Sequence, residues 1–187
     1  TSMLLPVFMI NEYFSTSTVG YFDLSRQILA VPIAFITASL SQVLLKDFSD
    51  RLRKKNPLTK SVLKTSLLLT LGIIPFVIAI VFWGKELFSF FFSDTWEQSG
   101  IYSAILVTAF AIQFIVSPLS ISFTVLEKLK TLAIWQILYF VAILSLRYFK
   151  DLSIENFLLL YTIINLSAYL IYYILIISIC RKYDKSL

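Results

Sequence analysis

Long uncharged stretches alternate with short charged segments along this chain of 187 residues, and the uncharged stretches are mostly apolar. A helix needs about 20 such residues to cross a lipid bilayer, whereas a buried strand is usually only about four to eight residues long. Backbone groups without partners are costly in lipid, so these stretches favour helix. The pattern predicts five complete transmembrane helices, over residues 27–45, 65–84, 98–126, 131–147 and 156–180.

The first ten residues are apolar but too short to span a membrane by themselves. They carry neither the basic start nor the small-residue cleavage site of a signal peptide. We therefore expect residues 1–10 to be the end of a sixth, preceding span of a longer protein. The predicted fold class is an all-α polytopic membrane helix bundle, in which residues 1–187 form one transmembrane lobe.

Lysine and arginine are distributed unevenly between the two sets of loops. Twelve of the sixteen Lys and Arg residues lie in residues 46–64, residues 127–130 and the tail after Cys180. The other four lie in residues 11–26, 85–97 and 147–155. Since cytoplasmic loops of membrane proteins carry an excess of Lys and Arg, we predict that the first set and the C-terminus are cytoplasmic. The basic segments also suit contact with anionic lipid headgroups, and no interleaved aromatic residues favour nucleic acid.

The composition removes most kinds of enzyme. The chain has no histidine, which excludes a Ser-His-Asp triad, a His-ligated metal and an imidazole base. Cys180 is the only cysteine, which excludes a disulfide framework and a cysteine metal cage. Neither a GxGxxG nor a GxxxxGKS/T motif is present to bind phosphate. We therefore predict that the protein is not an enzyme and holds no metal and no cofactor.

The first complete span carries a row of small residues and a charged pair at its outer end. Ala30, Ala34 and Ala38 recur at every fourth position, a spacing that lets another helix approach closely. Asp23 and Arg26 are one turn apart, so they are expected to form an ion pair with the acid near the helix start. The alternative is that Arg26, beside Asp23, faces a water-filled cavity and meets an anionic group such as a phosphate.

Two prolines are candidate hinges. Pro32 lies in the first complete span and Pro118 in the third, and a proline removes one backbone hydrogen bond and bends a helix. Pro32 is either a tolerated kink or a hinge for alternating access. The third span would be about 44 Å long as a continuous helix, against about 30 Å of hydrocarbon. Part of it must therefore tilt, lie at the interface or bend at Pro118.

Polar side chains recur on single faces of two further spans. One face of the third span carries Gln113, Ser117, Ser120 and Thr124. This face should either hydrogen-bond to neighbouring helices or line a polar lumen. One face of the last span carries Tyr161, Asn165, Ala168 and Tyr172. Tyrosine rings and amides suit contact with a sugar, although helix packing with satisfied hydroxyls explains them too. Gln113, Tyr161 and Asn165 join Arg26 and Asp23 as the candidate substrate-binding residues.

Two groups of residues resemble the signature of a known family. The first group is Gly20-Tyr21, Arg26, Pro32 and Ser39-Leu40-Ser41-Gln42-Val43, ahead of a basic loop. The second group is Trp96-Glu97-Gln98-Ser99-Gly100, followed by Ser117-Pro118-Leu119. Together they resemble the C-terminal half of the bacterial O-antigen and polysaccharide flippases. These are the polysaccharide biosynthesis or export proteins of the multidrug/oligosaccharidyl-lipid/polysaccharide exporter superfamily.

The resemblance implies one lobe of a two-lobe transporter. Its activity would be to flip an undecaprenyl-diphosphate-linked oligosaccharide, such as an O-antigen or capsule repeat unit, across the bacterial cytoplasmic membrane by alternating access. A proton or sodium gradient would drive it. The implied partners are the lipid-linked oligosaccharide, membrane lipids, the N-terminal lobe, a polysaccharide polymerase and a chain-length regulator. Arg26 would receive the anionic headgroup, and the faces of Gln113 and Asn165 would line the lumen.

Three other functions stay open. Another exporter of the superfamily would carry a drug or a lipid precursor, although all acidic residues lie outside the five predicted spans, which disfavours cationic drugs. A membrane-embedded polysaccharide-assembly enzyme is the second alternative. Polymerases of this kind have long outer loops, whereas the outer loop over residues 85–97 has only 13 positions. Membrane acyltransferases depend on a histidine, and this chain has none. A scaffold subunit without transport of its own is the third.

Overall fold

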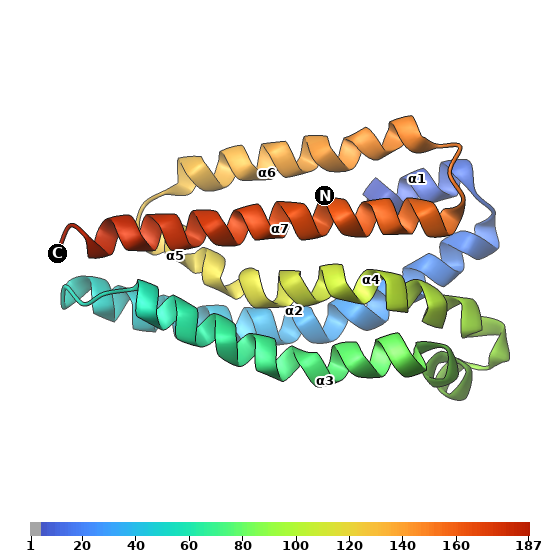
Figure 1. Ribbon diagram of the computed structural model, residues 1–187, viewed down its shortest axis with the longest axis horizontal. Coiled ribbons are helices and arrows are strands. Elements are labelled where there is room, and N and C mark those ends of the chain that lie inside the picture. The colour runs from blue at the N-terminus through green and yellow to red at the C-terminus, as the bar shows by residue number, and fades with distance from the viewer. Residues whose placement is uncertain (1–4) are drawn as a thin grey trace.

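The computed structural model describes residues 5–187, which form helices and turns and contain no strand. This confirms the predicted all-α fold class. Figure 1 shows the long helices running side by side along the long axis of the molecule. Five helical segments in this range are long and apolar enough to cross a membrane: Thr16–Arg53, Thr59–Phe92, Asp94–Val125, Leu129–Phe149 and Ile154–Asp184.

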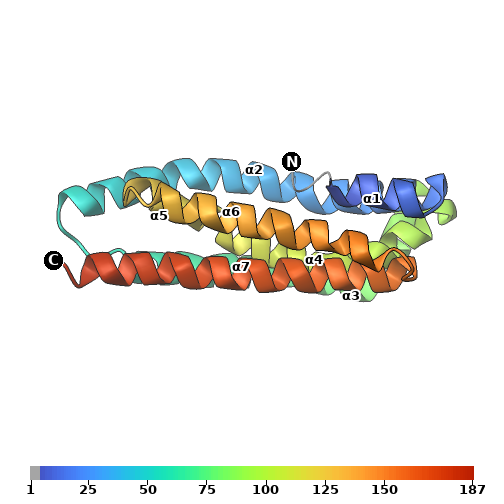
Figure 2. The ribbon, with the colours of Figure 1, turned by 90° about the horizontal axis from the view of Figure 1, so that it is seen from above.

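Helix α4 (Glu97–Val116) lies at the centre of the bundle. It packs against α2 (Thr16–Arg53), α3 (Thr59–Phe92) and α7 (Ile154–Asp184). In the membrane-length segment that contains α4, 44% of the most apolar 18-residue stretch is buried inside the bundle. In the other four membrane-length segments this share is 17–33%. Figure 2 shows α2 in one layer and α3 with α7 in the opposite layer. The remaining long helix, α6 (Leu129–Leu144), packs on α7 and on the short helix α5 (Ile121–Val125).

The helices extend beyond the uncharged windows from which they were predicted. Helix α2 begins at Thr16, where the Ser15 hydroxyl accepts a hydrogen bond from the Thr18 amide, and ends at Arg53. The loops expected over 11–26 and 46–64 are therefore largely helical. An uncharged window ends at the first charged residue, but backbone hydrogen bonds continue into water until a cap or turn stops them.

The third predicted span is interrupted at Pro118, one of the alternatives that its length left open. Helix α4 ends at Val116, the short 3₁₀ turn η2 (Pro118–Ser120) follows, and α5 then begins at Ile121. The expectation for residues 1–10 falls partly on residues 1–4, outside the described range. The part that is described belongs to helix α1 (Leu5–Tyr13), which packs on α2 and α6.

The three segments rich in Lys and Arg meet at one end of the bundle, together with the C-terminus (Figure 1). We call this the basic end. Its segments carry twelve cations and four anions, a net charge of +8, and the remaining segments at the opposite end carry four cations and seven anions. Contacts join the basic segments, since the Asp184 carboxylate accepts hydrogen bonds from the Leu58 and Thr59 amides. The structure therefore supports the predicted alternation of the loops.

The buried apolar residues form two clusters, one toward each end. The cluster at the opposite end joins α1, α2, α4 and α7 and includes Phe22, Leu29, Leu106 and Phe157. The cluster at the basic end includes a stack of aromatic rings. There the Tyr172 ring stacks with two others, Trp135 at 3.9 Å and Phe123 at 5.5 Å between ring centroids. Aromatic stacking of this kind adds to the apolar burial that holds α5, α6 and α7 together.

Candidate functional site

Asp23, Arg26 and Gln27 form a polar cluster in the third and fourth turns of α2, at the opposite end. Arg26 Nη2 lies 2.6 Å from Asp23 Oδ1, which confirms the predicted ion pair. Gln27 Nε2 donates to Asp23 Oδ2, also at 2.6 Å. The Arg26 side chain is 19% exposed and that of Asp23 is 35% exposed. The guanidinium is therefore partly withdrawn from solvent but still accessible.

The two segments that carry the family resemblance pack against each other beside this cluster. The Tyr21 ring on α2 meets the Trp96 ring edge-on, with centroids 5.7 Å apart. One turn further, the Ser25 hydroxyl lies 2.7 Å from the carbonyl oxygens of both Tyr21 and Ser99, so its single proton is shared between them. Residues separated by more than 70 positions in the sequence thus fix the start of α2 to the start of α4.

One exposed stripe along the middle of α2 has an amide at each end and small or aliphatic residues between them. It continues from the charged cluster at the spacing of successive turns, and its members are Gln27, Val31, Ala34, Ala38 and Gln42. A neighbouring exposed face carries Phe35, Ile36 and Val43 and suits lipid. Amide side chains inside a membrane face protein or water rather than acyl chains. Its two amides and its small residues therefore make this stripe the surface of α2 best suited to a partner other than lipid.

Tyr161 and Asn165 are buried, and neither lines an open space. They are 5% and 4% exposed, respectively. The Asn165 Nδ2 group donates to the Tyr161 carbonyl oxygen at 2.7 Å, and Asn165 Oδ1 accepts from the Tyr139 hydroxyl of α6 at 2.8 Å. Both polar groups of this amide are therefore satisfied inside the bundle. Contact with a substrate would require α6 and α7 to separate.

The polar face of the third span turns toward α7. Ser117 lies beside Tyr169 and Ser120 beside Tyr172. Gln113 is half-buried, and its side chain makes no hydrogen bond to any residue within 5–187. Of the two alternatives for this face, helix packing accounts for the two serines. Gln113 has no assigned partner within this range and stays a candidate substrate contact.

The two candidate hinges occupy different environments. Pro32 lies inside α2 and is exposed, so its ring does not hold another helix in place. Pro118 is buried at the start of η2, where α4 has ended. Helix α3 contains a further proline, Pro75, which is also exposed. The predicted hinge at Pro118 thus coincides with the end of α4, whereas α2 continues without a break through Pro32.

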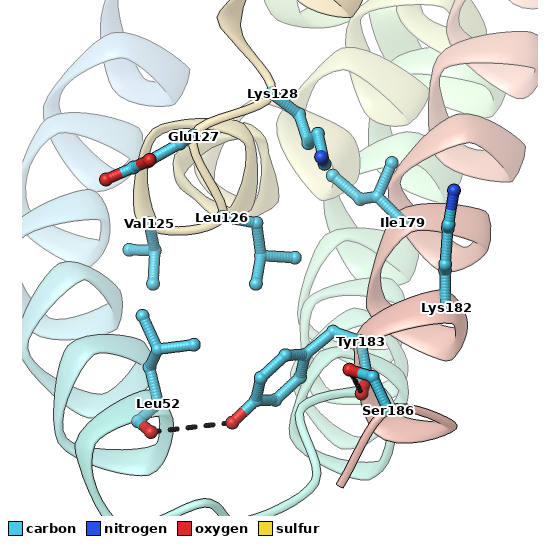
Figure 3. Close-up of a pocket in the computed structure, with 9 residues that line it drawn as sticks. All are labelled: Leu52, Val125, Leu126, Glu127, Lys128, Ile179, Lys182, Tyr183 and Ser186. Carbon is cyan, nitrogen blue, oxygen red and sulfur yellow. Dashed lines mark hydrogen bonds between the residues drawn. The ribbon is translucent and has the colours of Figure 1, made fainter.

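A cavity of about 400 Å³ opens at the basic end between the last turns of α2 and α7 and the turn that precedes α6. Its lining includes Leu52, Leu126, Lys128, Lys182 and Tyr183. Figure 3 shows the two lysine side chains on the same side of the cavity and the Glu127 carboxylate pointing the other way. The Tyr183 hydroxyl donates to the Leu52 carbonyl oxygen at 3.5 Å across its floor. None of the residues predicted as substrate contacts lies here.

Sequence reasoning missed two residues that the structure adds to the predicted set. Gln27 stands four positions after Asp23, and this spacing alone could have shown that it reaches the same carboxylate. Tyr139, the partner of Asn165, lies in the predicted span 131–147. No local pattern indicated it, because its partner is 26 positions away on another helix.

Comparison with known proteins covers the part of the chain that holds the charged cluster and the Tyr21–Trp96 contact. A family model described as polysaccharide biosynthesis protein matches residues 2–101, slightly more than half of the chain. No curated protein and no solved structure matches the chain significantly. The matched range includes all of α2 and α3 and the start of α4. On this evidence and on its membrane-length helices, the chain belongs to the polysaccharide biosynthesis protein family and is a multi-pass membrane protein.

Proposed function

We propose that this protein flips an undecaprenyl-diphosphate-linked oligosaccharide from the inner to the outer leaflet of the bacterial cytoplasmic membrane. The observation that carries the proposal is the exposed stripe of α2, which runs from Gln27 to Gln42 and begins beside Arg26. A lipid-linked oligosaccharide combines an anionic diphosphate, polar hydroxyls and a long apolar chain. The polar groups cannot cross hydrocarbon unaided, so they need a polar surface through the membrane.

Arg26 is the residue proposed to receive the diphosphate. Arginine presents several donors in a planar fork that matches phosphate oxygens. In the structure the guanidinium is bonded to Asp23, so an incoming anion would compete with that carboxylate for it. The Gln27 amide, which donates one hydrogen to Asp23 Oδ2, has a second N–H that could donate to the substrate. Tyr161, Asn165 and Gln113 would contribute only in a conformation that opens the bundle.

The stripe on α2 has no partner within residues 5–187, and we propose that the N-terminal lobe of the same protein faces it. Rocking of the two lobes would then alternate access to the path between them. A proton or sodium gradient is the proposed energy source, and no cofactor or catalytic step is required. With the basic end in the cytoplasm, Arg26 would stand near the outer surface and would receive the diphosphate at the end of the path, before its release into the outer leaflet.

The test is the substitution Arg26→Ala in the full-length protein, with surface polysaccharide and protein level both measured. Arg147→Ala is the matched control, since Arg147 lies at the same end but is 69% exposed and only loosely paired with Glu12 at 3.5 Å. We expect the Arg26 variant to lose surface polysaccharide several-fold at an unchanged protein level and the Arg147 variant to keep it. Normal polysaccharide with Arg26→Ala would remove Arg26 from the site.

A second measurement separates transport from the alternatives. The purified protein in vesicles is given a lipid-linked oligosaccharide on one side, and an impermeant lectin on the other side reports its arrival. Transport without a new glycosidic bond supports a flippase. Polymer formation would indicate an assembly enzyme instead, and neither activity would favour a scaffold.

A further inference from the structure

A surface groove between α3 and α7 changes from apolar to cationic along its length. Its volume is about 630 Å³, and it lies at the basic end. It is lined by Leu63 of α3 and by Tyr173, Ile174, Ile177, Ser178, Arg181, Lys182 and Lys185 of α7. The α7 residues recur on one helix face over twelve positions, which is about 18 Å along the axis. The groove therefore runs parallel to the direction of a lipid chain in the bilayer.

The apolar part of this groove is open to its surroundings. Ile174 is 64% exposed and Leu63 is 44% exposed, so both present hydrocarbon outward. The cationic part begins one turn after Ile177, where Arg181 and Lys185 share a face at a spacing of four residues. Lys60 and Lys64 lie within one turn of Leu63 on α3 and add to the positive charge.

The cations of the groove are not neutralised by the protein. Within residues 5–187, no salt bridge involves Arg181, Lys182 or Lys185. The nearest acid in sequence, Asp184, is engaged elsewhere, since its carboxylate accepts from the amides of Leu58 at 2.7 Å and Thr59 at 3.0 Å. Cations in a last turn also complement the helix dipole, but that effect does not require an apolar groove beside them.

The walls of the groove are held at a fixed separation. The Ser66 hydroxyl of α3 and the Tyr173 hydroxyl of α7 lie 2.8 Å apart and form a hydrogen bond between the helices. At the far end, the two bonds from Asp184 tie α7 to the start of α3. A ligand that enters the groove would therefore not have to order these helices first, which lowers the cost of binding.

We propose that this groove binds one anionic phospholipid of the leaflet at the basic end. An acyl chain would lie along Leu63, Ile174 and Ile177, and the phosphodiester would lie against Arg181 and Lys185. Basic residues at the membrane edge attract anionic headgroups, and the groove adds a specific place for the chain. The groove offers little for an oligosaccharide, because Tyr173 is bonded to Ser66 and Ser178 is the one other neutral polar residue in its lining.

The test compares lipid retention by the purified full-length protein in native mass spectrometry. Phosphatidylglycerol and phosphatidylcholine with the same chains are the two ligands. We expect preferential retention of phosphatidylglycerol and a loss of about 25-fold in its affinity for the double variant Arg181→Gln/Lys185→Gln, at about fivefold per cation. Lys46→Gln/Lys54→Gln removes two exposed cations from the same end, and this control should keep the preference.

Three outcomes would overturn the proposal. Equal retention of the two lipids would mean that charge does not select the lipid, and an equal loss in both double variants would mean that only the diffuse charge of the basic end attracts it. Competition by soluble glycerophosphate as strong as by the lipid would mean an anion site without a chain. Ile174→Gln, at an exposed position, should weaken retention without a change in charge, and it keeps the proposal testable if the double variant does not fold. The lipid proposal does not depend on the flippase activity.

Discussion

Gly84 of α3 and Gly100 of α4 meet backbone to backbone where the two helices cross at the opposite end. A Cβ atom built at Gly84 would lie 2.9 Å from the Gly100 carbonyl oxygen. A Cβ atom at Gly100 would lie 2.6 Å from both the Gly84 carbonyl carbon and the Lys85 Cα atom. Small residues permit such an approach between membrane helices. The Lys85–Glu97 ion pair, at 3.0 Å, spans the same crossing.

Gly100→Ala should destabilise the protein by about 1–3 kcal/mol, because the added methyl group meets only backbone atoms and the helices must move apart. Gly84→Ala should act in the same direction. Gly72→Ala is the matched control, since nothing lies within 4 Å of its Cβ position. There the gain in helix propensity should leave stability equal or raise it by up to about 1 kcal/mol. Thermal unfolding in detergent measures both, and equal midpoints for Gly100→Ala and Gly72→Ala would contradict the close crossing.

Asp184→Ala should loosen the start of α3. The carboxylate satisfies two amides that have no partner within the helix, and loss of a cap costs about 1 kcal/mol. Hydrogen exchange at Leu58 and Thr59 should accelerate, while exchange at the centre of α3 should not change. Asp50→Ala is the control, because Asp50 makes only an exposed pair with Arg53. Unchanged exchange at both amides would show that the cap does not hold in solution.

Tyr139 and Asn165 should be energetically coupled, because they share a hydrogen bond between α6 and α7. A double-mutant cycle with Tyr139→Phe and Asn165→Ala should give a coupling of about 0.6 kcal/mol and at most about 2 kcal/mol. Surface polysaccharide measured on the same variants distinguishes the two roles of Asn165. If Asn165→Ala abolishes export while Tyr139→Phe retains it at equal stability, Asn165 acts on substrate as well as on packing.

The basic end should face the cytoplasm. A single cysteine at Asn56, in a chain that also carries Cys180→Ala, should be protected from an impermeant thiol reagent in intact cells. A single cysteine at Thr95 in the same background should be labelled, because Thr95 is exposed at the opposite end of the bundle. Labelling of the Asn56 cysteine with protection of the Thr95 cysteine would reverse the orientation and move Arg26 to the cytoplasmic side.

The membrane-length helices were predictable because lipid imposes a strong local condition. About 20 consecutive apolar residues suffice to mark a span, and no distant residue has to be known. The Asp23–Arg26 ion pair was predictable for the same reason, since its partners lie one turn apart on α2. The helix ends were set too short, because α2 continues past Lys46 to Arg53, where hydration no longer penalises charge.

The polar faces were only half predictable. Periodicity placed Ser117 and Ser120 on one side of their segment, but it could not say what that side meets. The structure turns them toward Tyr169 and Tyr172 of α7, where they serve packing. Asn165 was likewise placed on a polar face, and its bond to Tyr139 depends on the position of α6. Periodicity assigns a residue to a face of its own helix, and contacts require the neighbour.

The sequence by itself therefore determined the class of the protein, the positions of its membrane helices, the separation of basic and acidic ends and the local ion pair at Arg26. Each of these follows from interactions with solvent or within one helical turn. The tertiary structure decided the crossing of Gly84 and Gly100, the capping of α3 by Asp184 and the burial of Asn165. These contacts join residues that are far apart in the chain, and their energies depend on which helix faces meet, which only the packing of the whole bundle sets.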